Sequence, residues 1–171
     1  MISIDPIRIA IVGMGNCASS LLQGRDFYKK SNSTKGLINE RIGPYGPGDF
    51  DVVLGIDVDA RKVGLDVSDA VLAPPNNTTV FQDNLDPTGT RVIMGRILDS
   101  VAEHMTQAGD RGFCISDQAE ASQQDIVDAL ISSRAEVLVN FLPVGSQLAT
   151  EFYMECALAA GVAVVNCIPV F

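Results

Sequence analysis

Short aliphatic runs alternate along the chain with segments whose apolar residues recur at helical spacing. Each aliphatic run is typical of a buried strand, and apolar residues three or four positions apart are typical of an amphipathic helix. The predicted strands cover residues 7–12, 51–57, 78–81, 136–142 and 162–168. The predicted helices cover residues 16–30, 59–73, 90–108, 122–133 and 146–160. This alternation predicts βαβ units and an α/β fold with a doubly wound, mostly parallel sheet.

Local signals mark the ends of several predicted elements. Ser122 precedes an apolar-periodic segment and Asp125 follows three residues later, which is the spacing of a reciprocal capping box. Gly161 is predicted to end the helix over 146–160, because glycine readily adopts the left-handed conformation that is common just after a helix. The helix over 59–73 is expected to be short and interrupted. Residues 31–50, rich in Gly, Pro and Ser, are predicted to form a loop.

Composition narrows the class of protein. A length of 171 residues suits one well-buried domain. Hydrophobic residues make up 47% and aromatic residues 6%, which predicts a core of Val, Ile, Leu and Ala between helices on both faces of a sheet. No apolar run approaches the roughly 20 residues that a membrane helix needs, and no secretory signal is recognised. We therefore expect a soluble, cytoplasmic protein with no membrane partner.

Charge and cysteine spacing argue against two further classes. The net charge is −9 and no basic stripe is present, so a nucleic-acid partner is not expected. Cys17, Cys114, Cys156 and Cys167 form no C-x-x-C pair, and His104 is the only histidine, so no metal site is predicted. The last three cysteines lie among apolar residues and are expected to be buried. His104 is interpreted as a surface or packing residue rather than a catalytic base.

The motif GMGNCA lies between the first predicted strand and helix and has the pattern G-x-G-x-x-A. In this context Gly13 permits a tight turn, Gly15 lets the backbone approach a pyrophosphate, and Ala18 lets the helix pack against the strand. The amides near Asn16 and Cys17 would point at the anion, with help from the helix dipole. The motif predicts a Rossmann-like dinucleotide site. The alternative is a tight turn that holds no ligand.

An acidic residue ends the second predicted strand, as a dinucleotide site requires. Asp57 is expected to accept hydrogen bonds from ribose hydroxyls, although it lies well beyond the usual spacing of about 20 residues after the glycines. The long loop before the strand accounts for the excess. An acid here favours NAD over NADP, while the nearby Arg61 leaves NADP open. Asp59 and Asp66 are further candidates, or else solvated carboxylates near helix ends.

The segment FLPVGS follows the fourth predicted strand at its carboxyl end. Ligands of open α/β sheets bind at that edge, near the point where the strand order reverses. Contact with the nicotinamide half of a cofactor is therefore predicted, although Pro143 and Gly145 could serve only to form the turn. No triad, paired carboxylate or catalytic lysine is recognised, so no catalytic residue is predicted.

Six motifs occur in order along the chain: RIAIVGMGNCASSLLQG, DVDARKVGLDVSDA, PPNNT, NFLPVGS, FYMECALAAGVAVVN and IPVF. Together they resemble inositol-phosphate synthases of the actinobacterial and archaeal type, from about residue 7 onwards and more weakly across 82–120. The resemblance implies an isomerase of inositol and phospholipid biosynthesis that converts D-glucose 6-phosphate to 1D-myo-inositol 3-phosphate. In that family NAD oxidises C5, enolisation follows, C6 attacks the C1 aldehyde, and the NADH formed reduces the ketone.

By motif match, the resemblance also assigns cofactor contacts. It places the pyrophosphate at the glycine turn, the adenosine ribose at Asp57, and the nicotinamide along 142–144. Ser133 would act through its backbone. The implied cofactor-binding residues are Gly13, Gly15, Asn16, Cys17, Asp57, Asp66, Ser133, Leu142, Pro143, Val144 and Tyr153.

The resemblance implies that part of the enzyme lies elsewhere. The family's catalytic lysines belong to an inserted α+β domain that these residues do not include, and the parent enzyme would be a homotetramer. Residues 1–171 are therefore expected to be an incomplete Rossmann domain, because the sequence stops just after a core strand, and to be inactive alone. The alternatives are a stand-alone NAD-binding module, or the cofactor domain of another NAD-dependent dehydrogenase.

Overall fold

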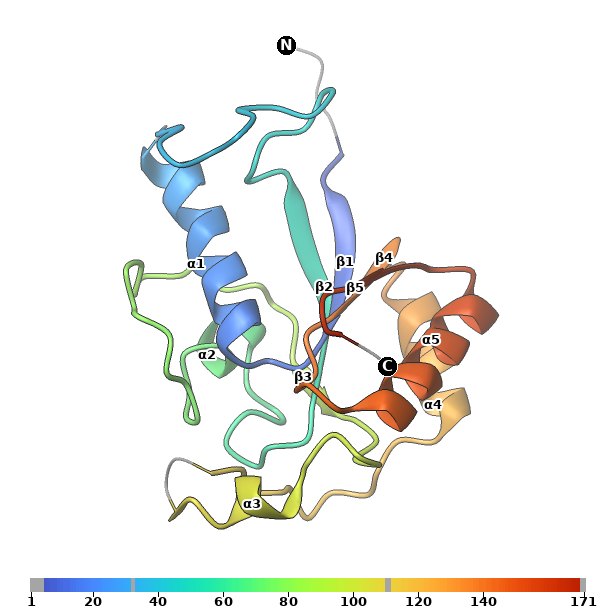
Figure 1. The fold of residues 1–171 in the computed structure, drawn as a ribbon. Helices are drawn as coiled ribbons and strands as arrows, with labels where there is room; N and C mark the ends of the chain where they lie inside the picture. The colour runs from blue at the N-terminus through green and yellow to red at the C-terminus, as the bar shows by residue number, and fades with distance from the viewer. Residues whose placement is uncertain (1–4, 32, 110–111, 170–171) are drawn as a thin grey trace.

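The computed structural model describes residues 5–31, 33–109 and 112–169 and has one five-stranded sheet (Figure 1). The strands are β1 (Ile7–Val12), β2 (Phe50–Asp57), β3 (Val92–Met94), β4 (Val137–Asn140) and β5 (Ala163–Asn166). All neighbouring strands run parallel, in the order β3-β2-β1-β4-β5. The chain thus builds outward from β1 to β3 and then returns to the other side of β1. The predicted α/β, Rossmann-like, doubly wound sheet is confirmed.

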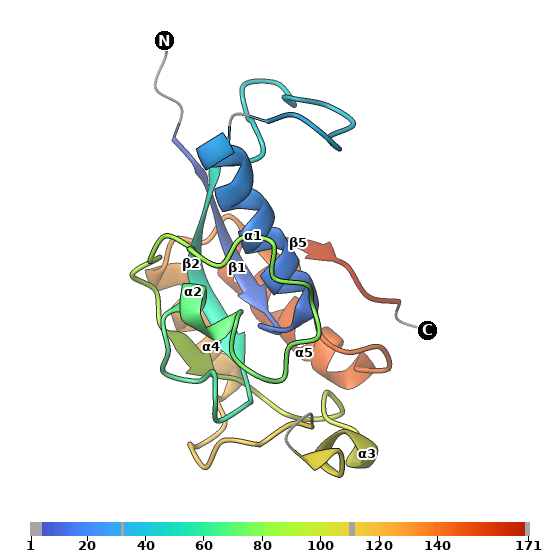
Figure 2. The same ribbon diagram turned by 90° about the vertical axis from the view of Figure 1, so that its left-hand side faces the viewer.

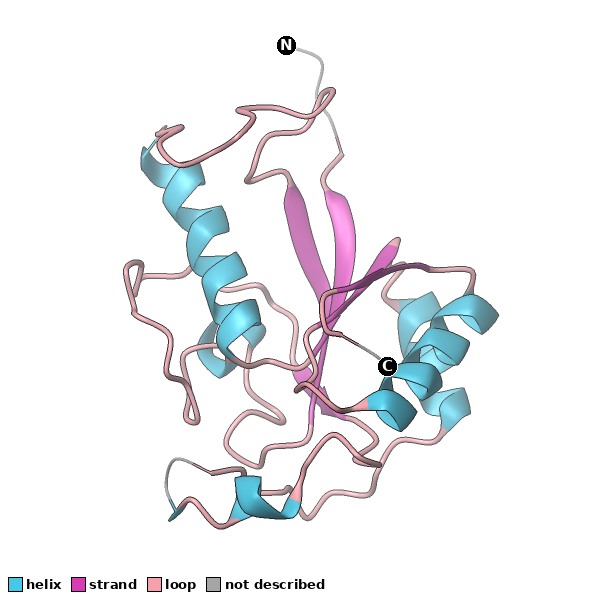
Figure 3. Ribbon diagram, viewed as in Figure 1, coloured by secondary structure: helices cyan, strands magenta, loops and turns pink. Residues whose placement is uncertain are grey.

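Helices cover both faces of this sheet (Figure 3). The helices are α1 (Asn16–Ser31), α2 (Val67–Ala70), α3 (Glu103–Thr106), α4 (Gln123–Ser132) and α5 (Gln147–Ala160). Alternate residues of β1 point to opposite faces: Ile11 packs with Leu22 of α1, and Val12 packs with Leu130 of α4. Helices α1 and α2 lie on one face and α4 and α5 on the other, whereas α3 lies apart from the sheet (Figures 1 and 2).

Strand register brings four loops to one edge of the sheet. Val12, the last residue of β1, lies opposite Ile56 in β2 and Asn140 in β4. Asp57 at the end of β2 lies opposite Met94 at the end of β3. The loops that leave these strands therefore start at the same carboxyl edge, which is where open α/β sheets bind ligands.

The third strand is not where the hydrophobic pattern placed it. Residues 78–81 form no strand, and Val80 and Phe81 are about half exposed. The strand is instead β3, inside the helix predicted over 90–108, where Val92 and Met94 are both buried, as alternation along a strand requires. Of that helix only α3 forms. Gly95 directly follows β3 and lies against the hydroxyl of Tyr153, where the structure leaves no space for a side chain.

Several smaller predictions can also be compared. Helix α4 begins with the expected capping box of Ser122 and Asp125, and Gly161 ends α5 in the left-handed conformation. The helix predicted over 59–73 is reduced to α2.

The buried or exposed state of three cysteines was also predicted. Cys156 is buried as expected, but Cys114 and Cys167 are exposed, so their predicted burial is wrong. Both lie in loops outside the packed faces of the sheet. Within the described residues, no helix has the length and apolar character needed to cross a bilayer.

Candidate dinucleotide-binding site

The two glycines of the turn after β1 serve different purposes. Gly13 has a φ of 90°, and a Cβ added there would lie 2.7 Å from the carbonyl oxygen of Phe141. Its amide donates to the Ile56 carbonyl at 2.9 Å. Both the backbone conformation and the close approach of the loop after β4 therefore require glycine here.

Gly15 is glycine for another reason. A Cβ added at this position would meet no atom within 4 Å, so it would enter open space. The Gly15 carbonyl accepts from the Ser19 amide at 2.9 Å, which starts α1 directly after the turn. Cys17, in the first turn of the helix, is exposed. The space beside Gly15 is thus bounded by backbone at the start of a 16-residue helix, which suits an anion.

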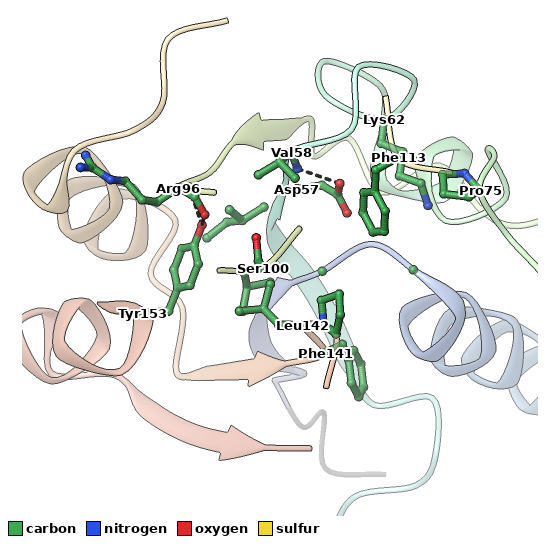
Figure 4. Close-up of a pocket in the computed structure, with 15 residues that line it drawn as sticks. Asp57, Val58, Lys62, Pro75, Arg96, Ser100, Phe113, Phe141, Leu142 and Tyr153 are labelled. Carbon is green, nitrogen blue, oxygen red and sulfur yellow. Dashed lines mark hydrogen bonds between the residues drawn. The ribbon is translucent and has the colours of Figure 1, made fainter. Parts of the chain in front are cut away.

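Two adjoining cavities open onto this space. The first, about 70 Å³, extends to Asp57, Lys62 and Tyr153 (Figure 4). The second, about 430 Å³, extends to Asn16 and Cys17 and lies in the size range of ligand pockets, roughly 300–1,000 Å³. The residues that line both are Gly15, Pro75, Phe113, Phe141, Leu142 and Pro143. The predicted glycine turn therefore faces a divided, largely apolar hollow at the carboxyl edge.

The Asp57 carboxylate is turned inward and holds the glycine turn. Oδ2 accepts from the Met14 amide at 2.7 Å, and Oδ1 accepts from the amides of Val58 and Asp59 at 2.7 and 2.9 Å. Burial raises the pKa of Asp57, against the opposing effects of these amides and of Lys62. Oδ2 carries one hydrogen bond, so it retains capacity to accept another from a ligand in the first cavity.

Lys62 is a buried cation beneath the same turn. Only 2% of it is exposed, and its Nζ donates to the carbonyl oxygen of Met14. Burial lowers the pKa of Lys62, whereas the carboxylates of Asp57 and Asp59 oppose that change. Met14 is thus held at its amide by Asp57 and at its carbonyl by Lys62. The sequence analysis missed this lysine, because lysine is almost always a surface residue.

Asp59 and Arg61 form a separate pair that anchors the loop after α3. The guanidinium donates to both carboxylate oxygens of Asp59, at 2.8 and 2.6 Å, and to the Gly112 carbonyl at 2.6 Å. The Cys114 amide also donates to Asp59. Burial acts to raise the pKa of Asp59, but the Arg61 guanidinium and the backbone amides of Cys114 and Arg61 lower it overall. The anchored loop carries Phe113 over the cavities.

Tyr153 lines the first cavity from α5, on the side away from Lys62 (Figure 4). Its hydroxyl accepts from the Arg96 amide at 2.7 Å and donates to the Arg96 carbonyl at 3.3 Å. Burial raises the pKa of this phenol, so it stays protonated. Tyr153 therefore fixes the loop that leaves β3, and it lies among the residues expected near the cofactor.

The loop after β4 forms the floor of both cavities. The Phe141 amide donates to the Val12 carbonyl at 2.9 Å, and the Leu142 amide donates to Oδ1 of Asn140 at 3.0 Å. Pro143 follows them on the cavity wall, and Val144 is 67% exposed beside the second cavity. The predicted nicotinamide segment, 142–144, thus lies next to the glycine turn.

The loop over 75–78 covers the start of α1, a role that the sequence analysis did not assign to the PPNNT motif. The Asn77 amide donates to Oδ1 of Asn16 at 2.9 Å, and the Thr78 hydroxyl donates to the Asn16 carbonyl at 3.1 Å. The Asn16 side chain is therefore used to hold this loop, and Pro75 of the same loop lines both cavities.

Two of the expected cofactor residues lie away from this edge. Ser133 follows α4 just before β4 begins, so it is near the amino end of that strand. Asp66 caps α2 and lies against the segment that enters β3. Its Oδ1 accepts from Ser68 and Thr88, and its Oδ2 accepts from the Gly89 amide at 2.8 Å. The structure does not bring these two residues together with the glycine turn.

The hydrogen bonds to Asp66 predict a pH-dependent contribution to stability. Burial acts to raise the pKa of Asp66, but hydrogen bonds from Ser68 and Thr88 lower it from 3.8 to about 2. The ionised form therefore stabilises the fold fully above about pH 4, and this contribution is lost as the pH falls toward 2. We expect Asp66→Asn to lower the free energy of unfolding at pH 7 by about 1–2 kcal/mol, after allowance for solvent screening.

Urea unfolding of the parent and of Asp66→Asn at a series of pH values measures this effect. The matched control is Asp69→Asn, at an exposed position in the first turn of α2, which should change stability by less than about 0.5 kcal/mol. A loss for Asp66→Asn that is as large at pH 2.5 as at pH 7 would contradict the assignment.

Curated proteins named inositol-3-phosphate synthase match nearly the whole chain, among them two from actinobacteria. The protein from Mycobacterium tuberculosis (strain CDC 1551 / Oshkosh) is 44% identical over 168 residues, which cover 96% of this chain and 44% of that protein. The protein from Corynebacterium glutamicum is 42% identical over 172 residues, covering 99% of this chain and 45% of that protein. The chain is a relative of the inositol-3-phosphate synthases. The resemblance inferred from the six motifs is confirmed.

Two solved structures have a similar fold. The crystal structure of a protein called Ari2 superposes with a TM-score of 0.78 at 34% identity and covers 97% of this chain and 47% of that one. A myo-inositol-1-phosphate synthase-related protein from Thermotoga maritima gives a TM-score of 0.69 at 20% identity, which supports the fold alone; it covers 97% of this chain and 49% of that one. No family model matches the chain. The chain spans less than half the length of the curated relatives that it matches.

Proposed function

We propose that this chain is the NAD-binding part of an inositol-phosphate synthase that converts D-glucose 6-phosphate to 1D-myo-inositol 3-phosphate. The observation that carries the proposal is the open space beside Gly15, between the start of α1 and two cavities at the carboxyl edge of the sheet. A side chain at position 15 would fill that space, so glycine keeps it free for a ligand. The similarity to proteins named inositol-3-phosphate synthase supports the choice of reaction.

The residues at this edge fit a dinucleotide. Backbone at Gly15, Asn16 and Cys17 would hold the pyrophosphate, and the remaining lone pair of Asp57 would accept a ribose hydroxyl. The loop 142–144 would lie along the nicotinamide. When bound, NAD supplies the hydride acceptor and donor of the reaction. The protein's own contribution is to orient the cofactor and to exclude water with apolar side chains such as Phe113 and Phe141.

Charges at the site support NAD rather than NADP. A 2′-phosphate at the end of β2 would meet the buried carboxylate of Asp57, and the two acidic groups would repel each other. Arg61, the residue that left NADP open, donates instead to Asp59 and to the Gly112 carbonyl. We therefore propose that the second phosphate of NADP is disfavoured.

The remainder of the activity is proposed from the family. Because the chain spans less than half of its curated relatives, we propose that the catalytic lysines and the sugar-phosphate site belong to a further α+β domain. We also propose that the parent enzyme is a cytoplasmic homotetramer. Residues 1–171 would then bind the cofactor without turning over the sugar phosphate.

Titration calorimetry and a turnover assay test this proposal. The protein should bind NAD more tightly than NADP and should form no inositol phosphate from glucose 6-phosphate and NAD. Tighter binding of NADP would contradict the cofactor assignment. Turnover by these 171 residues would contradict the proposal that the catalytic residues belong to a further domain. In a longer protein that contains this chain, NAD reduction with a different sugar or acid, but not with glucose 6-phosphate, would favour another dehydrogenase.

A further inference from the structure

The buried ammonium ion of Lys62 has unused hydrogen-bonding capacity. A lysine side chain carries three N–H donors. Among the described residues, the acceptor that Lys62 reaches is the Met14 carbonyl, so two donors have no protein acceptor there. Lys62 is 2% exposed and lines the first cavity, so these donors are largely withdrawn from bulk solvent. A buried cation in this situation requires a polar or anionic oxygen to compensate it.

The position of Lys62 points to the kind of oxygen. Its Nζ donates a hydrogen bond to the carbonyl oxygen of Met14, the residue between the two glycines of the turn. Both Lys62 and Gly15 line the first cavity. Figure 4 shows Lys62 beside Asp57 and Phe113, on the wall of that cavity. A phosphate group held over the turn would therefore come to rest near this ammonium ion. Lysine is a common ligand of phosphate, as a compact positive charge.

Other charged side chains around the cavities do not supply this positive charge. Among the described residues that line them, the charged ones are Asp57, Lys62 and Arg96. The Arg96 side chain is 42% exposed and pairs with Glu120 at 3.7 Å. Figure 4 shows its guanidinium pointing away from Asp57 and Lys62. Asp57 is an acidic group that supplies no positive charge, so Lys62 is the basic side chain that a dinucleotide would meet.

We propose that Lys62 donates a hydrogen bond to a phosphate oxygen of the bound dinucleotide while it holds the glycine turn through Met14. This inference rests on the proposed function and extends it. The G-x-G-x-x-A pattern accounts for phosphate binding by backbone amides alone. Here a buried side chain from the segment after β2 adds a full positive charge to that cradle.

The test compares two substitutions and three ligands. Lys62→Gln keeps N–H donors that can reach toward Met14 but removes the charge, and Lys62→Met removes both. The ligands are NAD, ADP and adenosine, and their dissociation constants are measured by calorimetry. Both variants should bind NAD and ADP about tenfold to a hundredfold more weakly, as expected for one charge-assisted hydrogen bond, and should bind adenosine as the parent does. Lys35→Met, an exposed lysine in the loop before β2, should change none of these constants.

Each other outcome counts against the inference. Unchanged affinity for NAD and ADP in Lys62→Gln would overturn it while leaving the proposed function intact, provided that the parent binds NAD. An equal loss for adenosine would show that Lys62 acts only by shaping the cavity. Failure of the parent to bind NAD or ADP would overturn both. If neither variant folds, the ¹⁵N resonance of the Lys62 ammonium in the parent decides: it should shift with ADP and not with adenosine, and no shift with ADP overturns the inference.

Discussion

Gly15→Val is expected to weaken NAD binding by at least about a hundredfold while the fold remains as stable as the parent. A Cβ at position 15 meets no protein atom within 4 Å, so the branched side chain finds room in the free protein. That room is the space beside the start of α1 where the pyrophosphate is proposed to lie. The loss of two or three hydrogen bonds to a charged ligand, at about 1.5–3 kcal/mol each, gives the expected factor.

The matched control for this substitution lies in the same helix. Gly24→Val introduces the same side chain at a position in α1 that also has open space, but two turns beyond the site. It should bind NAD as the parent does. Calorimetry gives the affinities, and thermal unfolding checks that both variants are folded. Equal affinity of Gly15→Val and Gly24→Val would show that the pyrophosphate does not lie beside Gly15. A substitution at Gly13 would not test pyrophosphate binding alone, because a side chain there meets the backbone of Phe141 and would disturb the fold.

The regular parts of the fold could be predicted because local pattern and tertiary burial agree there. Strands β1, β2, β4 and β5 are short aliphatic runs between turn residues, and each is followed by a helix or loop at the expected edge. The capping box before α4 and the glycine after α5 depend only on neighbouring residues. Such signals need no information about the rest of the chain.

The region between α2 and α4 could not be predicted, because contacts distant in sequence determine it. The apolar residues of 90–108 fit a helical period, yet Val92 pairs with Gly55 of β2 and so enters the sheet. Gly95 must then accommodate the Tyr153 hydroxyl, which comes from a helix far along the chain. The periodic pattern of one segment shows neither the pairing of Val92 with β2 nor the contact of Gly95 with Tyr153.

In the candidate site, too, some features could be predicted from local sequence and others depend on distant contacts. The glycine turn and the loop after β4 could be located from sequence, and the structure places them together at the carboxyl edge. The inward orientation of Asp57 could not, because the motif does not show which amides its carboxylate meets. The burial of Lys62 likewise depends on how the segment after β2 folds back over the turn. Because Asp57 and Lys62 both hold Met14, the acid at the end of β2 is expected to stabilise the glycine turn as well as to contact a ligand.

Asp57→Ala is expected to lower the free energy of unfolding by about 3–5 kcal/mol and also to weaken NAD binding. The substitution leaves the amides of Met14, Val58 and Asp59 without their acceptor and leaves the buried Lys62 without its nearby anion. Removing one partner from a buried charged pair has a cost of that size. Asp51→Ala, an exposed position in the same strand, should change stability by less than about 0.5 kcal/mol when both are measured by urea unfolding.

This expectation changes how a binding defect at Asp57 is to be interpreted. If Asp57 only accepted a ribose hydroxyl, Asp57→Ala would lose affinity for NAD and keep its stability. Because the carboxylate also holds Met14, the variant should lose both, and Asp57→Ala at parent stability would contradict the inward orientation seen here. The ribose contact is instead tested in the parent protein, where adenosine should bind more tightly than an analogue that lacks the ribose hydroxyls. The acid at the end of β2 would then have two roles, one toward the glycine turn and one toward the ligand.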